Sequence, residues 1–230
     1  MSNRPEPLEG VTACVFDAYG TLFDFSSVAQ AARQALGERA AALVALWRDK
    51  QLQMTWLLAA QGRHRDFWAV TGEALDFAFE AFGVRDRGLR DRLLARCLAL
   101  DVFPEAPEAL RRLKARGLRL AILSNGTPAM LEAVVGHAGL GGYFEAVISV
   151  EEAGVFKPHP RVYQSALDRL RLPREAISFQ SSNGWDAYAA SAFGMKVVWC
   201  NRSGQPPERL PGRPDRVVAS LAELEKIVVG

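Results

Sequence analysis

The stretch that decides the fold reads VTACVFDAYGTL at residues 11–22. Its first part, 11–16, is short, apolar and β-prone, and it ends at Asp17 with a glycine at position 20. An aspartate at the end of a buried strand, followed by a turn glycine, can direct its carboxylate into a cleft. The same pattern also fits an ordinary Asx turn that ends a strand. Neighbouring segments must therefore decide between a site and a turn.

Four further apolar runs have the same character and lie at 118–123, 146–150, 177–180 and 196–200. Short, near-continuously apolar runs are typical of parallel strands covered on both faces. Segments of helical period lie between them, at 105–116, 128–137, 161–170 and 185–193. Alternation of this kind predicts an α/β fold with a doubly wound parallel sheet.

Polar clusters follow these predicted strands. The second strand ends at Ser124, the third leads to Lys157, the fourth ends in 181–184 and the fifth at Asn201. Doubly wound sheets bind ligands beyond the carboxyl ends of their strands. We therefore expect a site at this edge of the sheet, with Asp17 in it.

Residues 25–100 interrupt the alternation, because they read as helices only and carry many aromatic side chains. An all-helical insertion after the first strand predicts a cap domain over the carboxyl ends. The expected domains are a core of 1–24 and 101–230 and a cap of 25–100. Residues 201–214, rich in Gly, Pro and Arg, predict a surface loop before an edge strand at 215–220.

Composition excludes several classes of function. The net charge of +2 and the scattered basic residues do not indicate nucleic-acid binding. Cys14, Cys97 and Cys200 show no zinc or disulfide spacing, which suits a reducing compartment. The N-terminus is polar, and no apolar run is long enough to cross a bilayer. These features predict a soluble cytoplasmic protein with no membrane partner.

The motifs together resemble those of the haloacid dehalogenase superfamily, over nearly the whole chain. The first motif is FDAYGTL at 16–22, the second LSNG at 123–126, the third FKPHP at 156–160 and the fourth SSNGWD at 181–186. The resemblance implies a Rossmann-like core, with Asp17 as a covalent nucleophile. Lys157 is alternatively a bland surface lysine, and Asp186 alternatively caps a helix N-terminus.

Two positions distinguish subfamilies by chemistry. A magnesium-dependent phosphatase of this type needs a second acid two residues after the nucleophile, and this chain has Tyr19 there. The aspartate that helps to hold Mg²⁺ in the fourth motif aligns with Ser182, although this hard cation prefers oxygen ligands such as carboxylates. A halide leaves as a stable anion and needs neither group. The sequence therefore predicts carbon–halogen cleavage with no metal or other cofactor.

The same motifs, together with WRDKQL at 47–52, resemble the type II L-2-haloacid dehalogenases. This resemblance implies that Asp17 attacks C2 of a small 2-haloacid, inverting that carbon and forming an ester. Arg48 would receive the halide beside Asn125 and Trp185, and Lys157 would keep Asp17 ionised. By spacing alone, Arg48 lies on an apolar helical stripe, where a snorkelling arginine is the alternative.

The remaining roles also come from the resemblance. Asp186, supported by Asn183, would activate the hydrolytic water, and Ser124 with nearby backbone amides would bind the substrate carboxylate. Further positions are assigned to orienting the catalytic groups or lining the pocket: Thr21, Ser181, Tyr163 and Tyr19. The three histidines, His64, His137 and His159, are interpreted as structural, surface or cap residues.

Several alternatives stay open at this point. The chain could be a metal-dependent phosphatase with a recruited acid, or a protein that only binds an anion or a partner in the same cleft. Within the subfamily, fluoride or the nitrogen of a strained ring amino acid could be the leaving group. Stereospecificity for the L substrate is inherited from the resemblance. Homodimer formation is a further open expectation, since the family often forms dimers.

Overall fold

Strand β1 (Ala13–Phe16) lies inside a six-stranded sheet whose strand order is β5-β4-β1-β6-β7-β8. A computed structural model describes residues 7–228 of the chain. All neighbouring pairs in this sheet are parallel, and Phe16 lies opposite Ile122 on one side and Gln180 on the other. The other strands are β4 (Arg119–Ser124), β5 (Ala146–Ser149), β6 (Ile177–Ser181), β7 (Lys196–Cys200) and β8 (Arg216–Val218).

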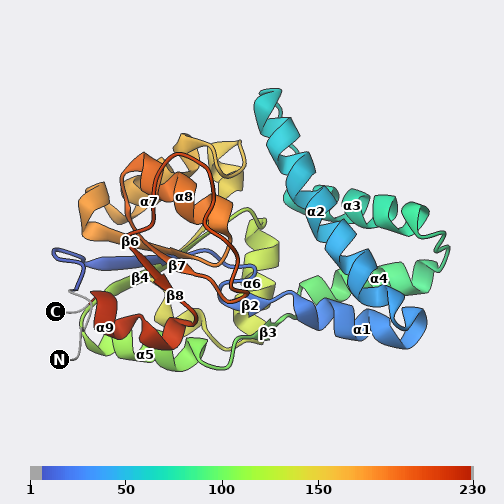
Figure 1. The fold of residues 1–230 in the computed structure, drawn as a ribbon, viewed down its shortest axis with the longest axis horizontal. Coiled ribbons are helices and arrows are strands. Elements are labelled where there is room, and N and C mark those ends of the chain that lie inside the picture. Colours follow the sequence, from blue (N-terminus) through green and yellow to red (C-terminus); the bar gives the residue numbers. More distant parts are fainter. Residues whose placement is uncertain (1–6, 229–230) are drawn as a thin grey trace.

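The core of the sheet is dry because helices cover both faces. All four residues of β1 are fully buried, as parallel strands between two helical layers require. Figure 1 shows α7 and α8 over one face and α5 and α9 against the other. The helices of this part are α5 (Ala106–Ala115), α6 (Pro128–His137), α7 (Pro160–Leu170), α8 (Gly184–Phe193) and α9 (Glu225–Val228).

Local sequence signals explain where these helices begin. Pro128 and Pro160 stand at first helical positions, where a missing N–H costs nothing. Thr127 and His159 precede them as N-caps, with side chains that accept hydrogen bonds from backbone N–H groups. The structural role expected for His159 is therefore observed. Short 3₁₀ turns, η1 (Gly141–Tyr143), η2 (Val150–Ala153), η3 (Arg174–Ala176) and η4 (Leu221–Glu223), complete the connections.

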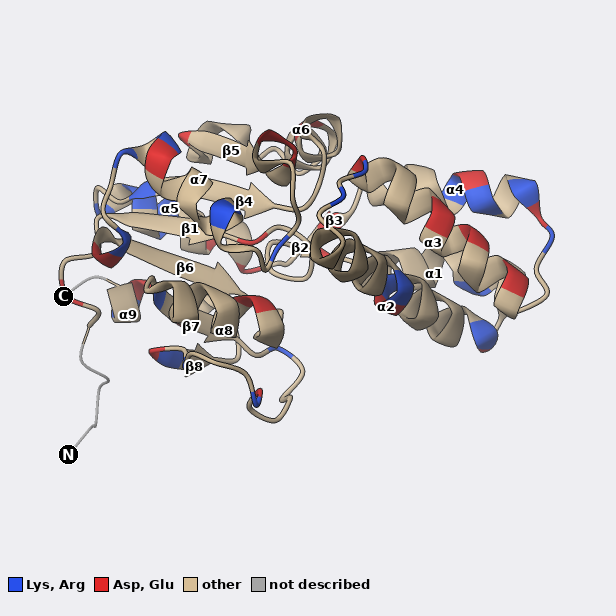
Figure 2. Cartoon of the chain, turned by 90° about the horizontal axis from the view of Figure 1, so that it is seen from above, with Lys and Arg blue, Asp and Glu red and all other residues tan. Residues whose placement is uncertain are grey.

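The predicted helical insertion is confirmed as a separate lobe, visible beside the sheet in Figure 1. It consists of α1 (Ser26–Leu36), α2 (Arg39–Ala60), α3 (Phe67–Ala81) and α4 (Arg87–Cys97). Strands β2 (Phe23–Asp24) and β3 (Asp101–Val102) pair antiparallel where the chain leaves the core and returns. The arrowheads of the parallel strands point towards this lobe in Figure 2, so it stands over their carboxyl ends.

The sequence predictions agree with the structure at the level of elements. The five strands predicted up to residue 200 and the four intervening helices are all present, with ends that differ by a few residues. The predicted edge strand at 215–220 is the shorter β8, and 201–214 forms no helix or strand. Within residues 7–228, no helix is long and apolar enough to cross a membrane. The polar N-terminus noted above lies largely outside the described residues.

Candidate active site

The parallel sheet brings three sequence-distant polar groups to one edge. Asp17 follows β1, while Ser124 and Ser181 are the last residues of the flanking strands β4 and β6. The Asp17 backbone N–H donates to Gln180 O at 2.9 Å, which extends the ladder to the end of the strand. Adjacent parallel strands end together, so their side chains converge on the same cleft.

The Asp17 carboxylate is held by three donors. Lys157 Nζ lies 3.0 Å from Oδ1, while Thr21 Oγ1 and Asn183 Nδ2 donate to Oδ2 at 3.0 and 2.9 Å. Thr21 is itself oriented, since its hydroxyl oxygen accepts from Ser182 N at 2.8 Å. Asp17 is only 6% exposed, and charge-assisted bonds are strong in such surroundings. The arrangement presents an oriented carboxylate in a nearly dry site.

Lys157 also contacts a second buried carboxylate. Its Nζ donates to Asp186 Oδ2 at 2.9 Å, and the Tyr163 hydroxyl donates to Asp186 Oδ1 at 2.7 Å. Burial opposes the charge on Lys157, but Asp17 and Asp186 outweigh burial and raise its pKa. Burial, reinforced by Asp17, raises the pKa of Asp186 above the usual aspartate value, while Lys157 and Tyr163 oppose this rise. One cation therefore links two carboxylates, and the two acids are not equivalent.

These contacts do not fit a magnesium site. The Lys157 ammonium already pairs with Asp17 Oδ1 and with Asp186 Oδ2. Tyr19 and Ser182 stand at the positions of the second acid and the metal-binding aspartate. Among residues 7–228, no group of three His, Cys, Asp or Glu side chains is arranged to hold a metal ion.

The loop after β4 is braced by its own side chains. Ser124 Oγ accepts from Gly126 N at 3.1 Å, and Asn125 Oδ1 accepts from Lys157 N at 3.0 Å. Asn125 thus turns its NH₂ group away from the Lys157 backbone. A Cβ atom on Gly126 would lie only 2.9 Å from the Tyr19 hydroxyl. Tyr19 is therefore packed directly against this loop.

The cap contributes a cation. Arg48, on α2, is half-buried, and its guanidinium lies 5.5 Å from the centre of the Phe25 ring. Burial lowers the pKa of Arg48, whereas electrostatic interactions with Asp17 and Tyr19 act in the opposite direction. The place of Arg48 in the cleft stays a prediction, and its electrostatic interaction with Asp17 supports it. A guanidinium in such a cleft can stabilise an anion that forms there.

Three predicted site residues have other contacts in the structure. Ser181 Oγ accepts from Asn183 N at 3.2 Å, so Ser181 shapes the loop that carries Asn183. Tyr163 is buried, and its hydroxyl donates to Asp186 Oδ1 at 2.7 Å. Trp185 packs edge-to-face on Trp56 of the cap, with ring centres 5.5 Å apart. This pair lies in an apolar groove of about 780 Å³ between α2 and the neighbourhood of α8.

Comparison with known proteins matches this geometry. Residues 11–194 match the model of the haloacid dehalogenase-like hydrolase family. The chain belongs to this family. A (S)-2-haloacid dehalogenase from Pseudomonas sp. (strain YL) is 44% identical over 215 residues, which span 93% of each chain. A haloacetate dehalogenase H-2 from Moraxella sp. (strain B) is 40% identical, across 96% of this chain and 99% of its own.

A solved structure shows that the similarity extends to the fold. The L-2-haloacid dehalogenase of Xanthobacter autotrophicus, with chloropropionic acid covalently bound, has a TM-score of 0.87 and 37% identity to this chain. The alignment covers 93% of this chain and 96% of that protein. The likeness therefore extends over the sheet and the helical lobe of this haloacid dehalogenase-like hydrolase.

Sequence reasoning missed a contact between the two lobes of this hydrolase. Glu151, in η2, accepts from Phe67 N at 3.1 Å and pairs with His64 Nε2 at 2.6 Å. The His64 ring also lies 4.8 Å from the Phe156 ring, next to Lys157 in sequence. His64, expected as a surface or cap residue, thus joins cap and core. Its partner is 87 positions away, and no local pattern signals such a pairing.

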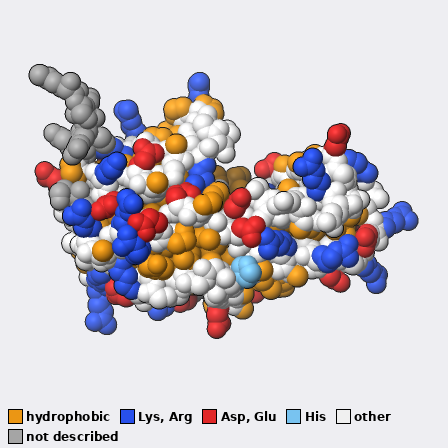
Figure 3. Space-filling view, turned by 90° about the horizontal axis from the view of Figure 1, so that it is seen from below, with side chains coloured by type: hydrophobic (Ala, Val, Ile, Leu, Met, Phe, Trp, Pro, Cys, Tyr) orange, Lys and Arg blue, Asp and Glu red, His pale blue; other side chains and the backbone are white. Residues whose placement is uncertain are grey.

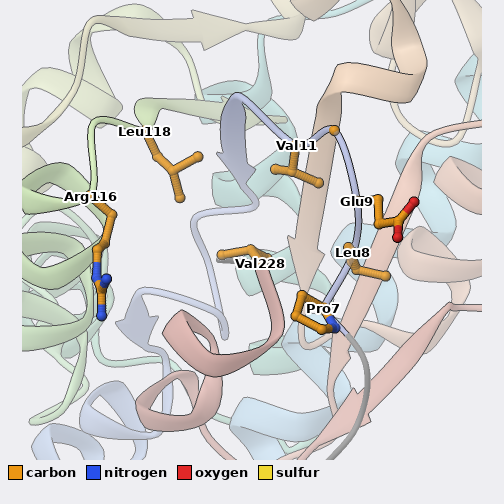
Figure 4. Close-up of a pocket in the computed structure, with 8 residues that line it drawn as sticks. Pro7, Leu8, Glu9, Val11, Arg116, Leu118 and Val228 are labelled. Carbon is orange, nitrogen blue, oxygen red and sulfur yellow. The ribbon is translucent and has the colours of Figure 1, made fainter. Parts of the chain in front are cut away.

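A further hollow lies away from this site. Basic and acidic side chains are interspersed over the face in Figure 3. A hollow of about 400 Å³ lies beside Val11, which precedes β1 and so marks the opposite edge of the sheet from Asp17. Arg116, in its lining, is already paired with Glu225 at 2.9 Å. Figure 4 shows the lining side chains: Pro7, Leu8, Glu9, Val11, Arg116, Leu118 and Val228.

Proposed function

We propose that this protein is a metal-independent (S)-2-haloacid dehalogenase, which hydrolyses L-2-haloalkanoic acids to D-2-hydroxy acids through an ester on Asp17. One observation carries the proposal: the Asp17 carboxylate is bound by Lys157, Thr21 and Asn183, while Tyr19 stands where a phosphatase needs an acid. An ionised, oriented carboxylate is suited to nucleophilic displacement. The names of the similar dehalogenases and the covalently bound chloropropionic acid in one solved structure support the same reaction.

In the first step, an Asp17 oxygen forms a bond to C2 of the substrate, and the carbon–halogen bond breaks with its electron pair leaving on the halide. Arg48 receives the developing anion, with the Asn125 NH₂ group as a neutral donor beside it. Charge that develops in a dry cleft is strongly stabilised by preorganised donors. Trp185 remains a candidate for the halide side, although its ring packs against Trp56.

In the second step, water adds to Cγ of the Asp17 ester and releases the 2-hydroxy acid. Asp186 takes the water proton, since each carboxylate oxygen has two lone pairs and retains capacity beyond its bonds from Lys157 and Tyr163. Lys157 and Asn183 stabilise the oxyanion as it forms at Cγ. The balance is one haloacid and one water giving one hydroxy acid, one halide and one proton.

Recognition of the substrate carboxylate is assigned to Ser124 and the backbone N–H groups beside it. This loop is held by the Ser124–Gly126 bond and by the bond from Lys157 N to Asn125. Tyr19, with Phe67 of the cap at 6.4 Å between ring centres, supplies an apolar wall for the alkyl group. Thr21 and Ser181 orient the nucleophile and its neighbouring loop.

The reaction class is tested by halide release from L- and D-2-chloropropionate in EDTA, beside phosphate release from p-nitrophenyl phosphate with Mg²⁺. Halide from the L form alone, unaffected by EDTA and abolished by Asp17→Asn, is the expected result. A single turnover in ¹⁸O water should place the label in Asp17, since water attacks Cγ. Phosphate release that needs Mg²⁺, without halide release, overturns the proposal. If neither substrate reacts, fluoroacetate and strained ring amino acids are the substrates to test next.

We also propose a cap of 25–100, a cytoplasmic setting and a homodimer. Cys14, Cys97 and Cys200 are all buried free thiols, in keeping with a reducing compartment.

The homodimer is supported by large apolar side chains exposed on the cap, namely Trp56, Leu57 and Phe77. Sedimentation of the wild type against Leu57→Glu tests it, because a charge in an apolar interface should shift the protein to monomer.

A further inference from the structure

A directed hydrogen-bond chain inside the cap ends at the halide-receiving arginine. Arg48 Nη1 donates to Gln51 Oε1, and Gln51 Nε2 donates to Thr71 Oγ1 at 2.6 Å. The Thr71 hydroxyl in turn donates to Phe67 O at 2.7 Å. We propose that Gln51 and Thr71 are positioning residues, which hold the Arg48 guanidinium in the orientation that accepts the departing halide. This inference rests on the proposed dehalogenase function.

The donors and acceptors of this hydrogen-bond chain can be assigned in only one direction. A threonine hydroxyl has a single proton, and that of Thr71 is used by Phe67 O, so its oxygen must accept from Gln51. This bond requires the NH₂ group of Gln51 to face Thr71 and its Oε1 to face Arg48. Reversing the amide would set its NH₂ group against a guanidinium, which has donors only. Thr71 thus determines which face Gln51 offers to Arg48.

The side chains of this hydrogen-bond chain are also held rigidly. Gln51 is 2% exposed and Thr71 is fully buried, so water does not compete for their bonds. Trp47 Nε1 donates to Thr71 O at 2.8 Å, which ties the same turn of α3 to α2 by a second atom. Phe25 supports Arg48 at the other end of the hydrogen-bond chain, because its ring packs near the Arg48 guanidinium and on Trp47. A long, flexible arginine is thereby limited to one arrangement.

The orientation of the Arg48 guanidinium should matter more for chloride than for bromide as the leaving group. Chloride concentrates its charge more than bromide and is the poorer leaving group, so its departure depends more on correctly aimed N–H groups. Breaking the hydrogen-bond chain should therefore slow chloride release more than bromide release. A general loosening of the cap would slow both equally, so the ratio of the two rates separates positioning from structure.

The test uses Gln51→Met and Thr71→Val, which keep side-chain size but remove the polar links. We expect kcat/KM for L-2-chloropropionate to fall roughly tenfold or more, as for a lost bond to a charged group, with a smaller fall for L-2-bromopropionate. Hydrolysis of the preformed Asp17 ester in single turnovers should be unchanged. The double variant should lose no more than Gln51→Met, because both changes break one chain.

Two controls accompany these variants. Thr55→Val removes a fully buried hydroxyl on α2 that donates to Leu52 O at 2.7 Å and takes no part in this hydrogen-bond chain. It should leave the ratio of the chloride and bromide release rates unchanged. Thr71→Ser keeps the hydroxyl and should restore the ratio. Equal losses for both halides, or no loss in Gln51→Met, overturn the inference while the wild type still releases halide. A wild type that releases no halide instead overturns the proposed function.

Discussion

Lys157 reaches Asp17 from 140 positions along the chain and places its Nζ 3.0 Å from Oδ1. The same ammonium lies 2.9 Å from Asp186, and the lysine side chain is 1% exposed. A buried cation between two carboxylates neutralises charge that neither acid could easily carry alone. We therefore expect both the stability of the fold and the orientation of the Asp17 carboxylate to depend on this lysine.

Replacing Lys157 by Met should abolish halide release and destabilise the protein. Breaking a buried pair typically costs about 3–5 kcal/mol, because the remaining charge is left uncompensated. Chemical unfolding and halide assays measure the two effects. The matched control is Lys114→Met, which removes an exposed lysine bonded to Gly142 O and should change neither quantity appreciably. A stable, active Lys157→Met variant would contradict the assigned role.

Removing the Tyr163 hydroxyl should move the acid limb of the pH profile. Asp186 must be ionised to accept a proton, so activity falls as the pH drops through its pKa. Burial raises this pKa, and the Tyr163 hydrogen bond opposes the rise. Tyr163→Phe removes the opposing bond, so the pKa rises further and the acid limb moves to higher pH. The pH profile of ester hydrolysis in single turnovers measures this, because Asp186 acts in that step, and an unmoved limb would exclude Asp186 as the group that titrates there.

The fold was largely predictable because its signals are local. The runs around Val15 and Ile122 are near-continuously apolar, which marks strands covered on both sides, and Pro128 and Pro160 mark helix starts. Convergence of Asp17 with Lys157 also follows from topology, since parallel strands end at one edge. These inferences need no knowledge of side-chain packing.

Side-chain direction was the part that local sequence does not encode. Tyr163 contacts Asp186 because α7 and α8 pack together, and the 23 positions between the two residues carry no local signal of this bond. The bond between Glu151 and Phe67 joins lobes far apart in sequence. Gln51 and Thr71 lie on different helices, so no helical periodicity relates them. Such pairings depend on tertiary structure.

Removing the Glu151 carboxylate should weaken substrate binding more than chemistry. Glu151 accepts from Phe67 N and pairs with His64, and Phe67 lies between the Tyr19 and Phe156 rings, 6.4 and 5.9 Å from their centres. Glu151→Ala loses both bonds, each typically worth about 0.5–1.5 kcal/mol, and frees the start of α3 to move.

The expected result is a KM for L-2-chloropropionate several times higher, with kcat changed less. Glu151→Gln keeps an acceptor for Phe67 N and serves as the matched control, with an effect smaller than that of Glu151→Ala. Steady-state kinetics distinguish the outcomes. A fall in kcat with KM unchanged would assign Glu151 to the chemical step instead of the junction between the lobes.

Adding one methyl group to Gly126 should disturb the site through Tyr19. A Cβ at this position would lie 2.9 Å from the Tyr19 hydroxyl and 3.0 Å from its ring, closer than real contacts allow. The ring must therefore move, and overpacking of this kind costs about 1–3 kcal/mol. We expect Gly126→Ala to lower both kcat/KM and the midpoint of thermal unfolding.

Gly136→Ala is the matched control for that substitution. Gly136 lies in α6, the helix that follows the Gly126 loop, and a Cβ there meets nothing within 4 Å. Alanine favours helix over glycine by about 1 kcal/mol, so this variant should be as stable as the wild type or more so. If Gly126→Ala behaves like Gly136→Ala in activity and stability, Tyr19 is not held by its contact with the loop, and its wall position requires another cause.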